Sequence, residues 1–298
     1  MPSFLSNLVK GQITLMNPLL QRLDVKKSRD LQEGLGRLQQ RAMGERVRFE
    51  DVPFEHFEAS WALPNKITAT HALLYLHGGA YTAGEIDYSR GFGGAMAEQT
   101  ERAVLCTAYR LAPDHPFPAA LEDAAAAYHK MLESFPPKNI AFLGESAGGG
   151  LCYALALKCK QENWPLPSSI ITVSPWCDLT MERERAEDLK CRDMLLSCEG
   201  LSFSAQRYAG DTPLSDPLVS PLFGDLTGLP PSLMFAGTDE ILRDDAILMA
   251  EKLNAQGSPC VLEVAEGMWH AYVLYGMPES KEAISQIKGF LMRDAIDA

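Results

Sequence analysis

Among the residues whose types and spacing could do chemistry, the first is a serine between two glycines. The run Gly144-Glu145-Ser146-Ala147-Gly148 has the spacing G-x-S-x-G and lies between a short apolar run and a longer one. On a sharp strand-to-helix turn such a serine exposes its hydroxyl, and the flanking positions must be small because the turn is tight. The free amides at the start of the helix then point toward the serine. The pattern predicts Ser146 as a nucleophile and the Ala147 amide as a donor to an oxyanion; the alternative is a glycine-rich turn with an idle serine.

A second candidate feature is the run His77-Gly78-Gly79-Ala80-Tyr81, which directly follows another short apolar run. Adjacent glycines let backbone amides approach a substrate closely. We expect the amides of Gly78 and Gly79 to complete the oxyanion site with that of Ala147, each donor stabilising the transition state by about 3 kcal/mol. His77 is interpreted as a support of this loop rather than as a catalytic base, because its neighbours belong to the loop.

An acid and a base follow two later apolar runs. The first run leads into Thr238-Asp239-Glu240, and the second leads into Gly267-Met268-Trp269-His270. A carboxylate at such a position orients a histidine and stabilises its cation. We expect Asp239 to do this for His270, although Glu240 offers the same group. The other acids and histidines are less well placed, either within helices or away from the strand ends in question: Asp244, Asp245, His56, His71, His115 and His129.

The elements that must position these residues alternate along the chain. Several predicted strands are apolar throughout, which is typical of strands buried on both faces of a parallel sheet. Repeated strand–helix units predict an α/β fold with a mainly parallel eight-stranded sheet and helices on both faces. The active site of such a sheet lies beyond the carboxyl ends of its strands. Strands are expected at 46–53, 56–62, 71–76, 103–109, 139–143, 169–174, 231–236 and 260–265, and helices at 86–100, 119–134, 147–161, 199–209, 242–256 and 278–294.

Two segments lie outside this alternation. Residues 4–23 carry apolar side chains at helical spacing and predict a helix packed on the body of the protein. A membrane-surface anchor is the alternative, since basic residues lie nearby. Residues 180–229 begin with a charged run and are too long for a plain connection. We expect a single domain over 1–298, with a lid over the site formed by about 1–45 and 180–215.

Composition excludes several other classes of protein. The 298 residues carry a net charge of −12, from 27 basic and 39 acidic side chains, so the chain lacks the overall positive charge that attracts it to nucleic acid. No apolar stretch is long enough to predict a membrane span, and the N-terminus does not read as a signal peptide. The cysteine count is seven, an odd number, and no pair has C-x-x-C spacing. We therefore expect a reducing, cytoplasmic compartment.

The motifs together resemble the hormone-sensitive-lipase family of α/β-hydrolase esterases. The resemblance spans roughly residues 65–275, and the order of serine, acid and histidine is the one found in α/β-hydrolases. It is carried by HGGAY at 77–81, YRLAPDHPFPAALED at 109–123, GESAGG at 144–149 and DEILRDD at 239–245. The runs SPWCDLT at 174–180 and 216–240 also resemble a branch that contains acetyl hydrolases and monoterpene ε-lactone hydrolases.

The resemblance implies the triad Ser146, Asp239 and His270, the oxyanion amides named above, a helical lid, and no metal or organic cofactor. It also implies a preference for short acyl groups. Two positions depart from the family pattern. Ala80 replaces the third glycine of the usual HGGG, which bears on substrate shape. Glu145 replaces the aspartate that often precedes the nucleophile, and the sequence assigns it no role.

The resemblance predicts a carboxylic ester hydrolase that forms an acyl-enzyme on Ser146 and acts on a small ester or lactone. A lactone hydrolase with the same site is the main alternative, because both reactions use the same groups. A catalytically inactive ligand-binding member of the fold is a remote alternative. The oligomeric state stays open, with a homodimer as one candidate. Candidate walls of the substrate pocket are the large side chains near the motifs: Tyr81, Trp176, Phe203 and Met268.

Overall fold

The computed structural model describes residues 2–20, 25–66, 70–183 and 193–294. Its centre is one eight-stranded sheet with the order β1-β2-β4-β3-β5-β6-β7-β8. Strand β2 pairs antiparallel with β1 and β4, and the other neighbours are parallel. The strands are β1 (Val47–Pro53), β2 (Glu58–Pro64), β3 (Ala72–Leu76), β4 (Ala103–Ala108), β5 (Ile140–Glu145), β6 (Ser169–Val173), β7 (Ser232–Gly237) and β8 (Cys260–Ala265). The predicted mainly parallel, eight-stranded sheet is confirmed.

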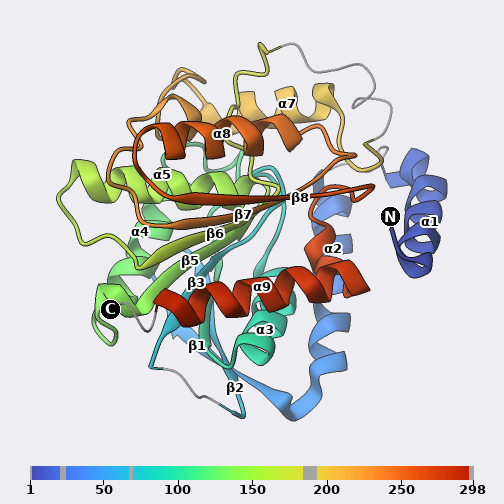
Figure 1. Ribbon diagram of the computed structural model, residues 1–298, viewed down its shortest axis with the longest axis horizontal. Helices are drawn as coiled ribbons and strands as arrows, with labels where there is room; N and C mark the ends of the chain where they lie inside the picture. Colours follow the sequence, from blue (N-terminus) through green and yellow to red (C-terminus); the bar gives the residue numbers. More distant parts are fainter. Residues whose placement is uncertain (1, 21–24, 67–69, 184–192, 295–298) are drawn as a thin grey trace.

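Helices cover both faces of the sheet, as predicted (Figure 1). Helices α4, α5 and α8 share one apolar core with alternate strand residues such as Leu74 and Phe142. Helices α3 and α9 share a second core with the intervening residues, such as Tyr75 and Leu143. All residues of β3 and β5 are buried, because each strand faces a core on both sides. The helices are α3 (Ile86–Thr100), α4 (Ala119–Leu132), α5 (Ala147–Gln161), α7 (Cys198–Ala209), α8 (Arg243–Ala255) and α9 (Pro278–Asp294).

Two further helices precede the sheet: α1 (Phe4–Leu20) and α2 (Val25–Met43). The predicted helix over 4–23 is confirmed over Phe4–Leu20, and its last three residues lie outside the described ranges. No helix was predicted over 25–43, since that segment is rich in charged and polar residues. It folds as a helix against α3, and Gly36 permits the close approach, because a Cβ there would lie 2.1 Å from the carbonyl oxygen of Asp87.

Both N-terminal helices are bonded to the loops beyond the carboxyl ends of the strands. On α2, the buried Glu33 carboxylate accepts the amides of Glu85, Asp87 and Tyr88 at 2.9–3.0 Å and so caps the start of α3. Arg29 donates to the carbonyl of Thr82 at 2.8 Å. On α1, Lys10 pairs with Asp239. The N-terminal segment therefore contacts the edge of the sheet where the site is expected.

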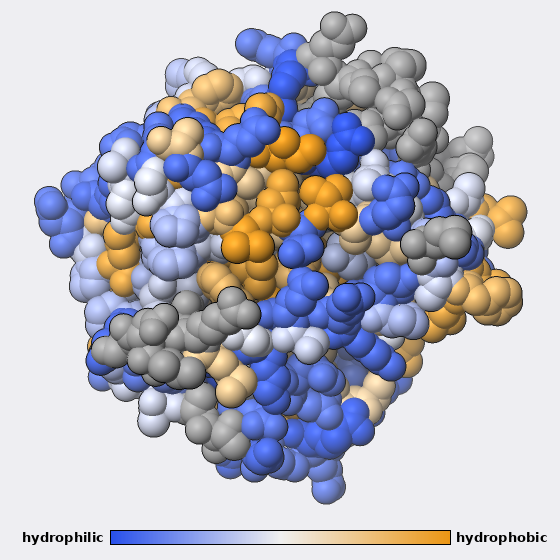
Figure 2. All heavy atoms as spheres, in the orientation of Figure 1, coloured by the Kyte–Doolittle hydropathy of each residue, from blue (hydrophilic) through white to orange (hydrophobic). Residues whose placement is uncertain are grey.

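The surface of α1 is apolar in part. Phe4 and Leu15 are 87% and 84% exposed, and hydrophobic atoms reach the surface along the edge that α1 occupies (Figure 2). No helix in the described ranges combines the length and the apolar character needed to cross a membrane.

Candidate active site

Ser146 lies on a strained turn between β5 and α5. Its φ of 56° and ψ of −124° are sparsely populated by residues other than glycine, and such strain is typical of functional sites. Two backbone hydrogen bonds hold the turn: the Ser146 amide donates to Val173 at 2.9 Å, and the Trp176 amide donates to the Ser146 carbonyl at 2.9 Å. The strand–turn–helix geometry expected of a nucleophilic serine is therefore present.

The two glycines of the motif are required by this turn. A Cβ at Gly144 would lie 2.4 Å from the carbonyl oxygen of Gly148. A Cβ at Gly148 would lie 2.0 Å from the carbonyl oxygen of Leu76, the last residue of β3. Both distances are shorter than any tolerated contact, so the spacing G-x-S-x-G follows from close backbone approach.

The loop after β3 passes directly beside the serine. A Cβ at Gly78 would lie 3.1 Å from the Ser146 Cβ, so backbone and nucleophile are in near contact. The next three residues turn through positive φ angles: 119° at Gly79, 53° at Ala80 and 60° at Tyr81. Amides of Thr82 and Ala83 close the turn on the Gly79 carbonyl, each at 3.0 Å. We call residues 77–81 the oxyanion loop below.

The structure of the oxyanion loop differs from the prediction at one of the expected oxyanion donors. The Gly78 amide donates to Oε1 of Glu145 at 2.5 Å, so it is already engaged and is not directed at a substrate. In the part of the chain that the structure describes, the amides of Gly79, Ala80 and Ala147 have no acceptor. The structure therefore does not support Gly78 as a donor to a substrate, whereas the Ala80 amide, which was not predicted as a donor, has no acceptor among the described residues. The sequence could not reveal which way each peptide turns.

His77 supports the oxyanion loop through its ring. The ring stacks on Tyr109 with centroids 4.2 Å apart and an interplanar angle of 4°. Its Nδ1 lies 2.7 Å from the carbonyl oxygen of Gly78, and the Tyr109 hydroxyl donates to the His77 carbonyl at 2.6 Å. Burial lowers the pKa of His77 to about 4, so the ring is neutral at neutral pH. These contacts agree with the predicted role of His77 as a support of the loop.

The acid beside His270 is Glu240 and not the predicted Asp239. Nδ1 of His270 lies 2.7 Å from Oε2 of Glu240, and both side chains are buried. The other oxygen, Oε1, accepts the Gly237 amide at 2.6 Å and the Ser174 hydroxyl at 2.8 Å. The buried carboxylate is thus fixed by three hydrogen bonds.

The backbone of the turn after β7 explains this correction. The Asp239 amide donates to the Met268 carbonyl at 2.9 Å, and the Asp239 carboxylate pairs with Lys10 of α1. Asp239 therefore faces the N-terminal helix, while Glu240 faces the interior. The Ser174 hydroxyl also accepts the Ala271 amide at 3.0 Å. Through Ser174, the turn that carries Glu240 is therefore connected to the loop that carries His270.

Three carboxylates raise the pKa of His270. Burial lowers its pKa, but the hydrogen bond and charge of Glu240 and the charges of Asp193 and Glu145 together raise the pKa above its ordinary value. Among the described residues no hydrogen bond joins the Ser146 hydroxyl to Nε2 of His270.

Asp193 was not identified from the sequence. Its carboxylate accepts the amides of Leu195, Leu196 and Ile241 at 2.8–2.9 Å, which ties the segment before α7 to the acid turn. Burial raises the pKa of Asp193, and the charge of His270 opposes that shift. No local pattern signals this role, because the contact with Ile241 spans 48 residues.

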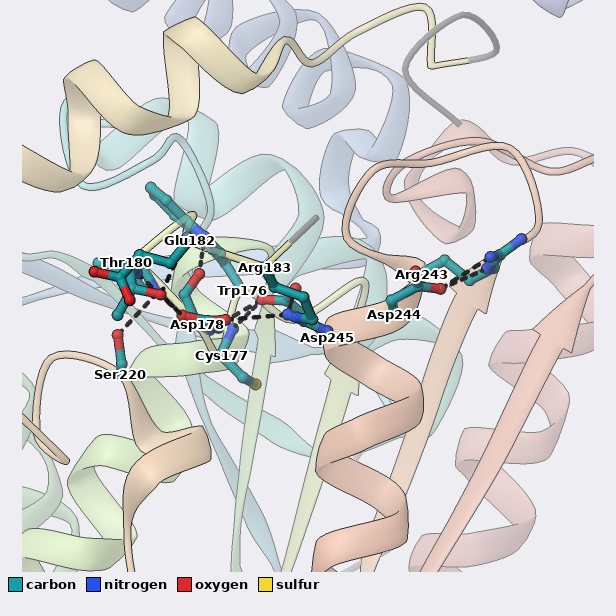
Figure 3. Close-up of polar contacts among 11 residues, drawn as sticks. Trp176, Cys177, Asp178, Thr180, Glu182, Arg183, Ser220, Arg243, Asp244 and Asp245 are labelled. Atoms are coloured by element: carbon teal, nitrogen blue, oxygen red, sulfur yellow. Dashed lines mark hydrogen bonds and ion pairs between the residues drawn. The ribbon is translucent and has the colours of Figure 1, made fainter. Parts of the chain in front are cut away.

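The rival acids of α8 have other partners (Figure 3). Asp245 is fully buried and accepts the amides of Cys177 and Asp178 at 3.1 and 2.9 Å, and Arg183 donates to it at 2.8 Å. Asp244 pairs with Arg243 at the surface. Asp245 therefore braces the loop after β6, which holds the Ser146 carbonyl through Trp176.

The predicted pocket residues do not form an open wall. Tyr81, Trp176 and Met268 are at most 1% exposed and pack in the two cores. Tyr81 stacks on Tyr208 of α7, with ring centroids 3.6 Å apart. Only Phe203 of the four is exposed, with the Arg207 guanidinium 3.5 Å from its ring centroid. Aromatic packing between the oxyanion loop and α7 accounts for the burial of Tyr81. Because all three are buried, the prediction of Tyr81, Trp176 and Met268 as pocket walls is not supported.

Known proteins resemble this chain over most of its length. The model of a family described as alpha/beta hydrolase fold matches residues 73–274. An acetyl-hydrolase from Streptomyces hygroscopicus is 38% identical over 247 residues, covering 82% of each chain, and an esterase from Acinetobacter venetianus is 36% identical over 75% of each. A solved esterase from the bacterial hormone-sensitive lipase family superimposes with a TM-score of 0.91 at 33% identity, covering 99% of both chains.

Proposed function

This chain belongs to the α/β-hydrolase family, among esterases of the hormone-sensitive-lipase type, and from this premise we propose that it hydrolyses short-chain carboxylic esters through an acyl-enzyme on Ser146. One observation carries the proposal: Ser146 lies on a strained turn next to the oxyanion loop, and the amides of Gly79 and Ala80 in that loop and of Ala147 have no acceptor within the described chain. Such amides, fixed in advance, stabilise the oxyanion of a tetrahedral intermediate.

The first half of the reaction forms the acyl-enzyme. His270 takes the proton of Ser146, and the serine oxygen attacks the ester carbonyl. The oxyanion accepts hydrogen bonds from the amides of Gly79, Ala80 and Ala147. The protonated His270 is stabilised by Glu240 and then protonates the departing alcohol. In the second half, His270 activates water, and the acid product leaves as Ser146 recovers its proton.

The N-terminal helices and the segment about 180–215 are proposed to form the lid over this site. Three contacts support the proposal: Lys10 with Asp239, Arg29 with the Thr82 carbonyl, and Tyr208 with Tyr81. Each joins a lid element to a loop that carries site residues. Residues 21–24 and 184–192 of the proposed lid lie outside the described ranges.

The test is a substrate series with covalent labelling. We expect turnover of p-nitrophenyl esters from acetate to decanoate to be highest for acyl chains of about six carbons or fewer. A fluorophosphonate should add once, and mass spectrometry should place the adduct on the peptide containing Ser146. A folded protein that hydrolyses none of these esters, or a label on another residue, would contradict the proposal, and ε-caprolactone would then be the next substrate to assay.

The pKa of His270 predicts the acid limb of the pH profile. His270 must be neutral to accept the serine proton, and its pKa lies above the ordinary value of about 6.5. The ratio kcat/KM for p-nitrophenyl butyrate should therefore fall as pH drops, with a midpoint above 6.5. Measurement between pH 5 and 9, corrected for spontaneous hydrolysis, checks this. A profile that is flat from pH 5 to 8 would count against His270 as the base.

A further inference from the structure

Glu145, the residue before the proposed nucleophile, is a buried carboxyl group that the mechanism above does not use. It ends β5 and is 1% exposed. Its Oε1 accepts the Gly78 amide at 2.5 Å and the Tyr88 hydroxyl of α3 at 3.1 Å. In the described chain Oε2 has no hydrogen-bond partner, and the carboxyl group is also close to Tyr75 of β3. Complete burial of a carboxyl group costs free energy of desolvation unless the group is held by hydrogen bonds, so its contacts indicate its role.

Glu145 contacts the Gly78 amide, near the start of the oxyanion loop. The Gly78 amide donates to Glu145, and the next three residues, Gly79 to Tyr81, all have positive φ angles. Gly78 and Glu145 are closely packed, because a Cβ at Gly78 would lie 3.0 Å from Oε1 of Glu145. The amides of Gly79 and Ala80, which follow Gly78, have no acceptor among the described residues.

We propose that Glu145 is a positioning residue of the oxyanion loop: its ionised carboxylate holds the Gly78 amide and thereby fixes the Gly79 and Ala80 amides toward Ser146. The inference rests on the proposed esterase function. An ionised acceptor makes a shorter and stronger hydrogen bond than a neutral one, so protonation or replacement of the carboxylate loosens the loop. The effect is on donors that act in the transition state, and it should appear in kcat more than in KM.

The surroundings of Glu145 make its charge sensitive to pH near neutrality. Burial raises the pKa of Glu145 to about 7, against the lowering effect of the hydrogen bonds from Gly78 and Tyr88 and of the nearby Tyr75 hydroxyl. The titratable groups that interact with it come from five places: Tyr75 of β3, Tyr88 of α3, Tyr109 after β4, Cys152 of α5 and His270 after β8. Both Glu145 and His270 must therefore lose a proton for full activity.

The variant Glu145→Gln tests the role of the charge at nearly constant shape. Removing one oxyanion donor lowers kcat by about 100- to 1,000-fold in a serine hydrolase, so misplacing donors without removing them should cost about 10- to 100-fold. KM should change by less than about threefold. Affinity for an aryl trifluoromethyl ketone, whose adduct with Ser146 carries an oxyanion, should fall by the same factor as kcat/KM. Glu145→Asp keeps the charge and should recover part of the loss.

The pH profile separates positioning from a merely structural effect. If both groups must be deprotonated, log kcat/KM of the wild type falls below pH 6 with a slope approaching two, whereas Glu145→Gln leaves a slope of one. Tyr88→Phe removes one bond that lowers the pKa of Glu145 and should move the acid limb to higher pH. A wild-type slope of one, with Glu145→Gln within threefold of wild-type kcat, would overturn the inference. Circular dichroism at each pH checks folding, and phosphonate labelling of Ser146 tests the esterase function separately.

Discussion

Replacing Ser146 with alanine is expected to lower kcat by about 10⁵- to 10⁶-fold, which is the loss seen when the nucleophile of a serine hydrolase triad is removed. Alanine lacks the oxygen that attacks the carbonyl, and no acyl-enzyme can form. The oxyanion amides and the binding surface remain, so a residual rate above that in water should persist. The measurement is turnover of p-nitrophenyl butyrate together with loss of phosphonate labelling.

A matched serine provides the control. Ser168 lies near the opposite end of β5, where its hydroxyl donates to the Ile140 carbonyl at 3.0 Å. Ser168→Ala should keep kcat within about twofold of the wild type, since the residue is remote from the carboxyl edge of the sheet. Retention of most activity by Ser146→Ala, once contamination by wild type is excluded, would assign the nucleophile to another residue.

The parts of this site that could be predicted from the sequence depend on local geometry. Gly144 and Gly148 must be glycine because backbone atoms lie within 2.4 Å of where a Cβ would be, and that requirement gives the motif its spacing. The strands β3 and β5 are apolar throughout because both faces are covered. Such constraints act within a few residues of the chain, so a pattern of residue types records them.

The parts that could not be predicted depend on tertiary contacts. Asp239 and Glu240 are adjacent carboxylates on one turn, and tertiary contacts, among them the pairing of Asp239 with Lys10, 229 residues away, decide which faces inward. The choice between the Gly78 and Ala80 amides depends on the Glu145 side chain. Tyr81 is buried because α7 supplies Tyr208 as a stacking partner. In each case the deciding group is distant in sequence from the residue that it places.

The choice of acid is the correction with the largest functional consequence. Glu240→Gln should lower kcat by about 10³- to 10⁴-fold, because an amide in this position neither stabilises the imidazolium nor enforces the productive tautomer of His270. The loss of charge should also move the acid limb of the pH profile to lower pH, since the hydrogen bond and charge of Glu240 raise the pKa of His270. Steady-state kinetics between pH 5 and 9 measures both effects.

The neighbouring residue is a control with the same chemistry. Asp239→Asn removes a carboxylate next to the site, but that carboxylate pairs with Lys10, whose side chain is 30% exposed. A partly exposed pair contributes about 1 kcal/mol or less, so kcat should stay within about threefold and the acid limb should not move. If Asp239→Asn instead abolished activity while Glu240→Gln retained it, His270 would have to turn toward the other carboxylate during catalysis. The hydrogen bond between Glu240 and His270 would then belong to a resting arrangement of the two loops that carry these residues, and not to the arrangement that reacts.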